Sequence, residues 1–288
     1  MIKHPRLITG TLSAFLIAGI ASPALAATGG TKTVTDTKNQ QYSHTSSPRE
    51  FYNIYTENGG SYSDALRLTE QNNVFEPKFT VLRSSTPANE WVYPNIGQGG
   101  ERGMRPANTW NPTKVTEDGD PQASVNTTVK WPGNWNAGFD MWTEPTNDPS
   151  GKYQSHGGTE VMVWTAAARD GQEFNQAASG TKVRPAYIDG KWWNVTDGWT
   201  SLNGHRWRRI FFDAQQPVQK FSGQLNPFLG AATAYGMVST SHYLTGIQYG
   251  FEIDHGGGAG LAVNNLQITG VKDNTPQSGF WRYKIWQP

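Results

Sequence analysis

The sequence contains no cysteine, so disulfide bonds and a cysteine-linked lipid anchor are both excluded and the core alone must hold the fold. The six histidines show no pairing at metal-ligand spacing, so we expect neither a catalytic metal nor a cofactor. Structural calcium stays open, because loop oxygens that bind Ca²⁺ leave little sequence trace. There is no Gly-x-Ser-x-Gly elbow and no phosphate-binding loop.

Charge is also scarce. Charged residues make up 16% of the chain, against roughly 25% in an average globular domain. The net charge of +1 creates no overall field that would attract nucleic acid or an acidic membrane. Glycine (32) and tryptophan (12) are abundant instead. Together with many Asn and Thr residues, this composition indicates a secreted β protein with many turns and a surface suited to neutral sugars.

The N-terminus has the pattern of a secretory signal. Three of the first six residues are basic or histidine, residues 7–20 are largely apolar, and Ala24-Leu25-Ala26 is a small-x-small cleavage site. The apolar run is too short for a membrane span. We therefore expect residues 1–26 to be a signal peptide and the mature protein to be extracellular or periplasmic, without membrane attachment.

The rest of the chain predicts one domain. Residues 27–50 are rich in Thr, Ser, Gln and Lys without an apolar period, which indicates a mobile N-terminal lead. No later linker separates a second module, so residues 51–288 are expected to form a single domain, and a monomer is expected.

Short strand-like runs alternate with turn signals throughout this domain. The predicted strands are 64–69, 79–83, 90–93, 124–131, 138–143, 159–165, 181–188, 191–195, 206–213, 243–253 and 261–271. Asp189-Gly190 predicts a tight hairpin turn. One helix is expected, capped by Asn226, with Pro227 in its first turn and Gly236 at its end. These elements predict an all-β fold, a two-sheet β-sandwich with jelly-roll topology and one short helix.

The run from Thr159 to Thr165 has an unusual outer face. Strand alternation puts two valines and Thr165 on one side, as in a core, and Glu160, Met162 and Trp164 on the other. A carboxylate, a thioether and an indole in a row suit the floor of a groove that binds apolar and hydroxylated surfaces. The alternative is an ordinary strand with one glutamate at its rim.

Two further strands carry acids in the same way. In residues 243–253 the odd positions from Ile247 onward form an apolar face. Glu252 lies on the opposite, polar face, where Gly250 is expected to let a ligand approach the backbone closely. In residues 136–142, Asp140 and Trp142 share one face. Two carboxylates with different protonation states are what glycoside hydrolysis requires: one protonates the leaving oxygen, and the other attacks the anomeric carbon or activates water.

These stretches resemble motifs of glycoside hydrolase family 12, a family of small secreted β-1,4-glucanases. Glu160-Val-Met-Val-Trp164 resembles its E-x-M-I-W signature, and residues 243–253 resemble its Y-L-x-x-I-Q-x-G-F-E-I motif. Residues 136–142 are similar to its N-A-x-Y-D-I-W stretch, and residues 93–96 to its Y-P-N-I segment. The motifs follow the family order.

The resemblance implies a jelly roll with an open substrate cleft on its concave sheet. It also implies hydrolysis of internal β-1,4 bonds of glucans with retention of configuration. Glu160 would be the nucleophile, Glu252 the general acid/base, and Asp140 the acid that hydrogen-bonds the nucleophile.

Four residues are expected to bind substrate. Trp135 and Trp164 each lie beside a candidate acid, and Met162 shares the face of Glu160. Asn73 belongs to a stretch that loosely matches the family's N-N-x-W, with Phe75 in place of the tryptophan.

The chain departs from the family where Asp254-His255 follow the second glutamate, which leaves the pH optimum open. The preferred polymer also stays open among cellulose, mixed-linkage glucan and xyloglucan, because loops decide branch tolerance. A second interpretation is a non-catalytic carbohydrate-binding jelly roll. Such a protein would not need both glutamates, so their joint presence favours the enzyme.

Overall fold

The computed structural model describes residues 31–35, 40–43, 51–56, 65–71, 74–83, 91–100, 110–130, 133–151, 154, 156–169, 172–173, 183–202, 204–254, 258–272 and 284–285. The predicted signal peptide, Asn73 and His255 lie outside the described residues. Within the described part of the chain, no helix is long and apolar enough to cross a membrane.

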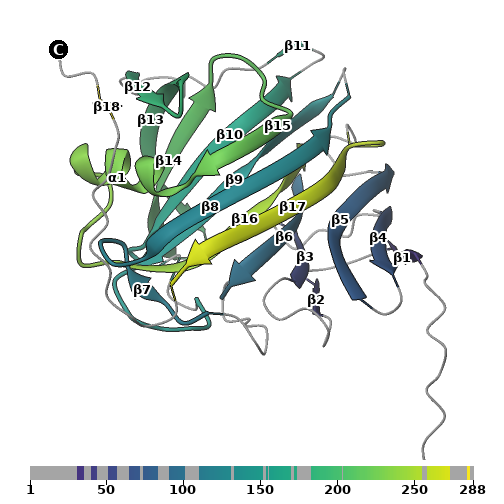
Figure 1. Cartoon of the computed structure of the whole chain (residues 1–288), viewed down its shortest axis with the longest axis horizontal. Helices are drawn as coiled ribbons and strands as arrows, with labels where there is room; N and C mark the ends of the chain where they lie inside the picture. The colour runs from purple at the N-terminus through teal and green to yellow at the C-terminus, as the bar shows by residue number, and fades with distance from the viewer. Residues whose placement is uncertain are drawn as a thin grey trace, which may run out of the picture.

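The protein is a sandwich of two β-sheets (Figure 1). The six-stranded sheet has the order β1 (Thr31–Thr35), β4 (Ala65–Gln71), β5 (Val74–Arg83), β17 (Ala262–Val271), β8 (Gly119–Thr128) and β15 (Lys220–Gln224). The larger sheet has the order β18 (Lys284–Ile285), β12 (Arg184–Ile188), β13 (Lys191–Leu202), β14 (His205–Ala214), β10 (Thr159–Arg169), β9 (Asn134–Glu144), β16 (Tyr243–Asp254), β6 (Trp91–Gly99), β3 (Phe51–Thr56) and β2 (Gln40–Ser43). β11 (Gln172–Glu173) pairs with β10, and β7 (Thr113–Lys114) with β16.

This architecture confirms the predicted fold class. Each of the eleven predicted strands overlaps a strand of the structure, and the predicted helix is α1 (Asn226–Ala234). Within the described residues the strand pairs are antiparallel, except that β10 and β14 run parallel.

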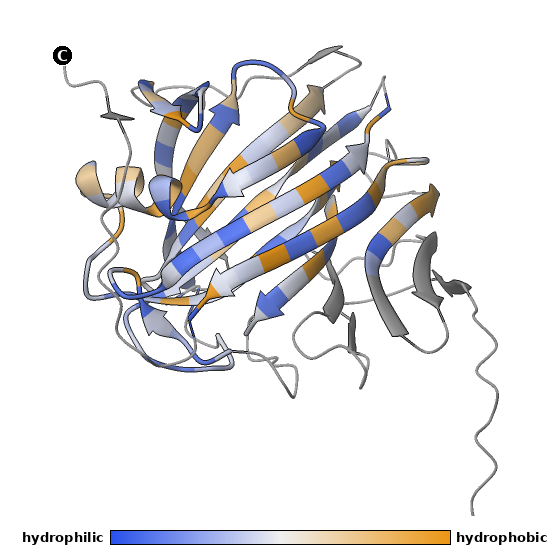
Figure 2. Ribbon diagram, viewed as in Figure 1, coloured by the Kyte–Doolittle hydropathy of each residue, from blue (hydrophilic) through white to orange (hydrophobic). Residues whose placement is uncertain are grey.

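The core lies between the sheets, because strands of both sheets alternate apolar and polar residues. Figure 2 shows this alternation as stripes along β8 and β17. From the larger sheet, β9 contributes Ala137, Phe139 and Met141, and β16 contributes Ile247, Tyr249, Phe251 and Ile253. Gln98 links the sheets inside the core: its Nε2 donates to the Ile268 carbonyl at 3.0 Å.

The β12–β13 hairpin has the predicted turn. Asp189 and Gly190 have φ angles of 49° and 75°, as a two-residue primed turn requires. Alternation along β13 sends the two adjacent tryptophans to opposite faces: Trp193 lies in the core, and Trp192 is exposed.

The helix differs from the prediction at its start. Leu225 is the N-cap residue, and no side chain caps the helix. Asn226, predicted as the cap, instead donates from Nδ2 to the Gly119 carbonyl at 2.6 Å, which ties α1 to β8. Gly236 has a φ of 70°, which confirms it as the residue that ends the helix.

Two strands, β1 and β2, lie within residues 27–50, which the composition predicts to be a mobile lead. β1 pairs with β4, and β2 pairs with β3, both antiparallel. An edge strand is held by backbone hydrogen bonds to one neighbour and needs no apolar alternation, so composition gave no sign of it.

Candidate active site

The three strands that carry the candidate acids are neighbours in the larger sheet. β9 is central, with β10 on one side and β16 on the other. Asp140 on β9 lies opposite Met162 of β10 and opposite Gln248 of β16. Because side chains alternate, Asp140, Glu160 and Glu252 all point away from the sandwich core, as predicted. The fold therefore gathers acids separated by up to 112 residues on one sheet face.

The two glutamates lie at different levels of this face. Glu160 is opposite Trp142, whereas Glu252 is opposite Asn136, six residues away along β9. Flat strands would separate these levels by about 20 Å, at about 3.3 Å per residue. We call the part of this face between the levels of Asn136 and Trp142 the band; it runs across the strands. The two glutamates stand on opposite sides of the band, and Asp140 lies inside it.

Irregular pairing accompanies this arrangement. The β9–β10 register shifts between Trp164 and Ala166, and the β9–β16 register shifts between Leu244 and Gly246. Such bulges bend a strand and increase its twist.

Glu160 accepts a hydrogen bond from a tryptophan that was not predicted from the sequence to belong to the site. Its side chain is only 6% exposed, and Trp207 of β14 donates from Nε1 to its Oε2 at 2.8 Å. The Trp207 ring lies 6.3 Å from that of Trp142, centre to centre. Arg209 is the residue of β14 in register with Glu160. The indole donor orients the carboxylate and fixes one of its oxygens.

Glu252 has its own oriented partner. Asn136, directly across on β9, donates from Nδ2 to Oε2 of Glu252. Glu252 is partly exposed, in contrast to the nearly buried Glu160. The two carboxyl groups thus have different surroundings, one dry and bound to an indole, the other wetter and bound to an amide.

Asp140 is also nearly buried, at 5% exposure. It lies diagonally across from Glu160, since Trp142 is directly opposite Glu160 and Asp140 is two residues further along β9. Diagonal neighbours of a sheet are within reach of long side chains.

Met162 and Trp164 lie on the predicted face, in a small apolar cluster outside the main core. The cluster contains Met162, Trp164, Ala167 and Phe211. The Trp164 and Phe211 rings meet edge to face at 5.2 Å. Gly138 is needed beneath Trp164, because a Cβ there would lie 3.0 Å from the indole Cδ1. Both predicted residues are almost buried, so they shape the floor of this face from below.

The assignment of Trp135 to the substrate was wrong. Trp135 is 3% exposed and belongs to the core, with its ring edge to face against Phe251 at 6.3 Å. Its Nε1 donates to the Lys130 carbonyl at 3.0 Å. The physical reason is strand parity: Trp135 is an odd residue of β9, like Phe139, and faces inward.

Gln248 is a second residue of this face that was not predicted from the sequence. It is fully buried on the acid-bearing face beside Asp140, and within the described structure neither its Oε1 nor its Nε2 has a hydrogen-bond partner. The space above Gly250, expected to admit a ligand, is taken: a Cβ there would lie 2.2 Å from the Pro94 carbonyl oxygen.

Over the described residues, no three His, Cys, Asp or Glu side chains gather closely enough to hold a metal ion.

Comparison with known proteins identifies a family whose match includes all three candidate acids. The model of glycosyl hydrolase family 12 matches residues 95–270. Endoglucanase A of Aspergillus kawachii is 28% identical over 158 residues, which cover 54% of this chain and 58% of that protein. Xyloglucan-specific endo-beta-1,4-glucanase A of Aspergillus niger is 29% identical over 152 residues, 51% of this chain and 58% of that protein. The chain thus spans less than two thirds of these relatives.

Solved structures share the fold over a larger part of the chain. Endoglucanase cel12A from Rhodothermus marinus superimposes with a TM-score of 0.68 and 23% identity, over 83% of this chain and 98% of that one. A family 12 xyloglucanase from Bacillus licheniformis gives a TM-score of 0.67 and 17% identity, over 84% of this chain and all of the other. These likenesses confirm the jelly-roll fold.

Proposed function

The chain belongs to glycosyl hydrolase family 12, and on that premise we propose that it is a retaining endoglycosidase that hydrolyses internal β-1,4-glucosidic bonds of glucans. The observation that carries the proposal is the position of Glu160, Asp140 and Glu252 on one face of three adjacent strands. The names of the relatives, endoglucanases and xyloglucan-specific endoglucanases, support the same substrate class.

In the first step, a carboxylate oxygen of Glu160 attacks the anomeric carbon while the bond from that carbon to the bridging oxygen breaks. Glu252, in its protonated form, gives its proton to the departing oxygen. In the second step, Glu252 takes a proton from water, whose oxygen displaces Glu160 from the anomeric carbon. The carboxylate and the carboxylic acid are then restored, and no other reactant is needed.

Neighbouring residues are proposed to fit the two glutamates to these roles. The bond from Trp207 to Oε2 leaves the ionised carboxylate of Glu160 in a fixed orientation. Asp140 is proposed to steer the same group from the adjacent strand. Asn136 orients Glu252 at the other side of the band. An open cleft that crosses the strands along this band is part of the proposal.

Stereochemistry tests the mechanism directly. Retention requires the two carboxyl groups to lie about 5–5.5 Å apart, whereas inversion needs about 6.5–9.5 Å. Glu160 and Glu252 pair with β9 residues that are six positions apart. Retention therefore requires strand curvature and the length of the two side chains to bring the carboxyl groups to about 5–5.5 Å. We expect NMR to detect the β-anomer as the first product from a β-glucan. An α-anomer formed first would contradict the nucleophilic role of Glu160.

The experiment that tests the function is a product profile on cellulose, mixed-linkage glucan and xyloglucan, with wild type and Glu160→Gln in parallel. Release of reducing sugar by the wild type, and its loss in the variant, supports an endoglycosidase. A non-catalytic binding protein would release none from any of the three. The same profile identifies the preferred polymer.

Export is proposed on the N-terminal sequence alone. We infer that residues 1–26 direct secretion and that cleavage follows Ala26. The mature enzyme would then act on polysaccharide outside the cytoplasm, as a monomer that engages neither membrane nor nucleic acid. N-terminal sequencing of the secreted protein should begin at Ala27, and a start at Met1 would exclude the signal.

A further inference from the structure

An exposed pair of aromatic residues lies on the β12–β13 hairpin. Tyr187 and Trp192 are directly paired across the two strands, and their ring centres are 5.1 Å apart. Their side chains are 39% and 46% exposed, although aromatic side chains of this size mostly bury their rings. The two-residue turn at Asp189-Gly190 fixes the hairpin that carries the two rings, whose planes are inclined at 54°, and we call this pair the platform.

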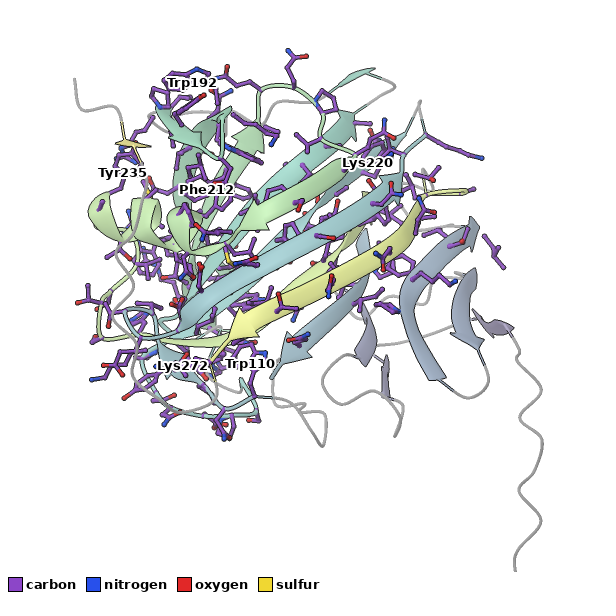
Figure 3. The ribbon with its side chains drawn as sticks, in the orientation of Figure 1. Trp110, Trp192, Phe212, Lys220, Tyr235 and Lys272 are labelled. Atoms are coloured by element: carbon purple, nitrogen blue, oxygen red, sulfur yellow. The ribbon has the colours of Figure 1, made fainter. Side chains whose placement is uncertain are left out.

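A cavity of about 510 Å³ opens beside this platform. Its walls are the start of β13 and the segment of residues 214–220 that leads from β14 to β15. Its polar side chains are the amides of Gln215, Gln216 and Gln219 and the ammonium groups of Lys191 and Lys220; none of its lining residues is acidic. Figure 3 shows Trp192 at the outer edge of the molecule, with Lys220 at the start of β15.

The cavity wall is fixed by backbone hydrogen bonds. Gln215 N donates to the Trp192 carbonyl at 3.2 Å, and Val218 N donates to the Thr165 carbonyl at 2.7 Å. The second bond joins the wall to β10, the strand of Glu160. A site held in this way is formed before a ligand arrives, and its volume is within the usual range for ligand sites.

The platform lies on the same side of the larger sheet as the acids, but far along it. Trp192 and Asn194 are two residues apart on β13, so they point to the same face. Asn194 is in register with Asp213 of β14, and Asp213 is in register with Trp164 of β10, which lies on the face of the acids. Glu160 is instead in register, through β14, with Gly198. Trp192 is six residues from Gly198 along β13, about 20 Å in an extended strand.

We propose that Tyr187, Trp192 and the adjoining cavity form a second binding surface for a neutral β-glucan chain, apart from the residues that cleave it. The proposal rests on the proposed function for the choice of polymer. Aromatic faces pack against the apolar faces of glucose rings, while the glutamine amides both donate to and accept from hydroxyl groups. A surface of this kind would keep the enzyme on a long polymer between cleavage events.

Trp199 provides a matched control. It is the more exposed tryptophan, at 55%, but Arg206 lies over its ring at 4.6 Å, so one face of the ring is already covered. Both substitutions remove one exposed indole from β13. Only loss of Trp192 should affect the polymer.

The test is affinity electrophoresis in gels that contain mixed-linkage β-glucan or xyloglucan, with every variant made on Glu160→Gln so that the polymer is not cut. We expect Trp192→Ala to weaken retention about tenfold, or 1.4 kcal/mol, and Trp199→Ala to leave it within about twofold. In the otherwise wild-type enzyme, Trp192→Ala should lower hydrolysis of polymer relative to hydrolysis of cellotetraose.

Retention that Trp192→Ala does not change would overturn the proposal. So would equal losses in both tryptophan variants, or an unchanged ratio of polymer to cellotetraose hydrolysis. Stronger Trp192-dependent retention in polygalacturonate gels would overturn the neutral polymer in favour of an acidic one. Failure of the proposed function is a separate result: the wild type would then release no reducing sugar, whatever the gels show.

Discussion

The two faces of β9, β10 and β16 differ in chemistry, yet both are largely buried. The inner face is an ordinary apolar surface, where Phe139 packs against Tyr249 at 4.6 Å and against Phe221 at 5.2 Å. The outer face buries Glu160, Asp140 and Gln248 to 6%, 5% and 0% exposure. The same three strands therefore carry a core on one side and a set of nearly dry polar groups on the other.

This difference separates stability from function. Burial of a polar group without full hydrogen bonding costs about 1–3 kcal/mol, and within the described residues the Gln248 amide has no partner. An apolar residue would pack there at lower cost. Sequences depart from such local rules mainly at functional sites, so the outer face is where substitutions should change activity more than stability.

The largest effect is expected for Glu160→Gln on the outer face. Loss of the nucleophile should lower kcat by at least about 10⁴-fold, the scale found when a nucleophile is removed from a hydrolase. The shape of the side chain is conserved, so the free energy of unfolding should change by less than about 1 kcal/mol. Reducing-sugar assays and urea unfolding measure the two quantities. Substantial residual turnover would remove Glu160 from the mechanism.

Phe139→Ala should do the opposite from the inner face of β9. Loss of the ring leaves a cavity between the sheets and should lower the free energy of unfolding by about 3–5 kcal/mol. Below the unfolding transition, kcat should stay within a few-fold of wild type, because the acids face the other way. Urea unfolding followed by tryptophan fluorescence gives the first value. A kcat loss comparable to that of Glu160→Gln in folded protein would erase the distinction between the faces.

The sequence predicted the inner face more completely than the outer one. Alternation alone placed Val161, Tyr249 and Phe251 in the core and their neighbours outside, and the structure confirms this. The same rule, counted back from Phe139, would have put Trp135 in the core. Nearness to Asp140 along the chain was the weaker guide, because a sheet brings together residues of different strands.

What the sequence could not supply is contact across strands. Trp207 lies 47 residues from Glu160, and no local pattern links them; only the parallel pairing of β10 with β14 does. Arg208 and Arg209 are adjacent in the sequence, yet the first binds Asp197 and the second lies in register with Glu160. Register depends on the whole sheet, so these partners appear only in the folded structure.

Trp207→Phe sharpens the role of the outer face by removal of a single donor. A smaller aromatic ring remains, but Glu160 loses its indole hydrogen bond, and kcat should fall about 10- to 100-fold with little change in KM. One oriented donor lost at a reacting group typically has an effect of this order or larger.

Trp193→Phe is the matched control for Trp207→Phe. Trp193 also donates from Nε1, to the Ile188 carbonyl at 3.3 Å, but in the core. Its variant should lose about 1–3 kcal/mol of stability, because a hydrogen bond and part of a buried ring are both removed, and should keep kcat. Steady-state kinetics of both variants decide the point: equal kcat values would mean that the bond to Glu160 has only a structural role.

The smallest effect is expected away from both faces, at Asp197 on β13. Arg208 contacts Asp197 from Nη2 at 2.5 Å, and Arg184 contacts it from Nη1 at 2.9 Å. Arg208 also donates to the Gly236 carbonyl at 2.9 Å, so the network joins the end of α1 to the sheet. Partial burial would by itself raise the pKa of Asp197, but hydrogen bonds from the two arginines outweigh it and lower the pKa below its ordinary value.

A lowered pKa in the folded state means that the ionised Asp197 stabilises the fold above the unfolded-state pKa, about 3.9. This stabilisation is lost as the pH falls through the folded-state value. Asp197→Asn should therefore lower the free energy of unfolding by about 1–2 kcal/mol at pH 7, and the difference from wild type should shrink as the pH falls below about 4. Urea unfolding of both proteins over this range measures the effect. A difference that persists unchanged in acid would show that packing, rather than the charge of Asp197, connects the helix end to the sheet.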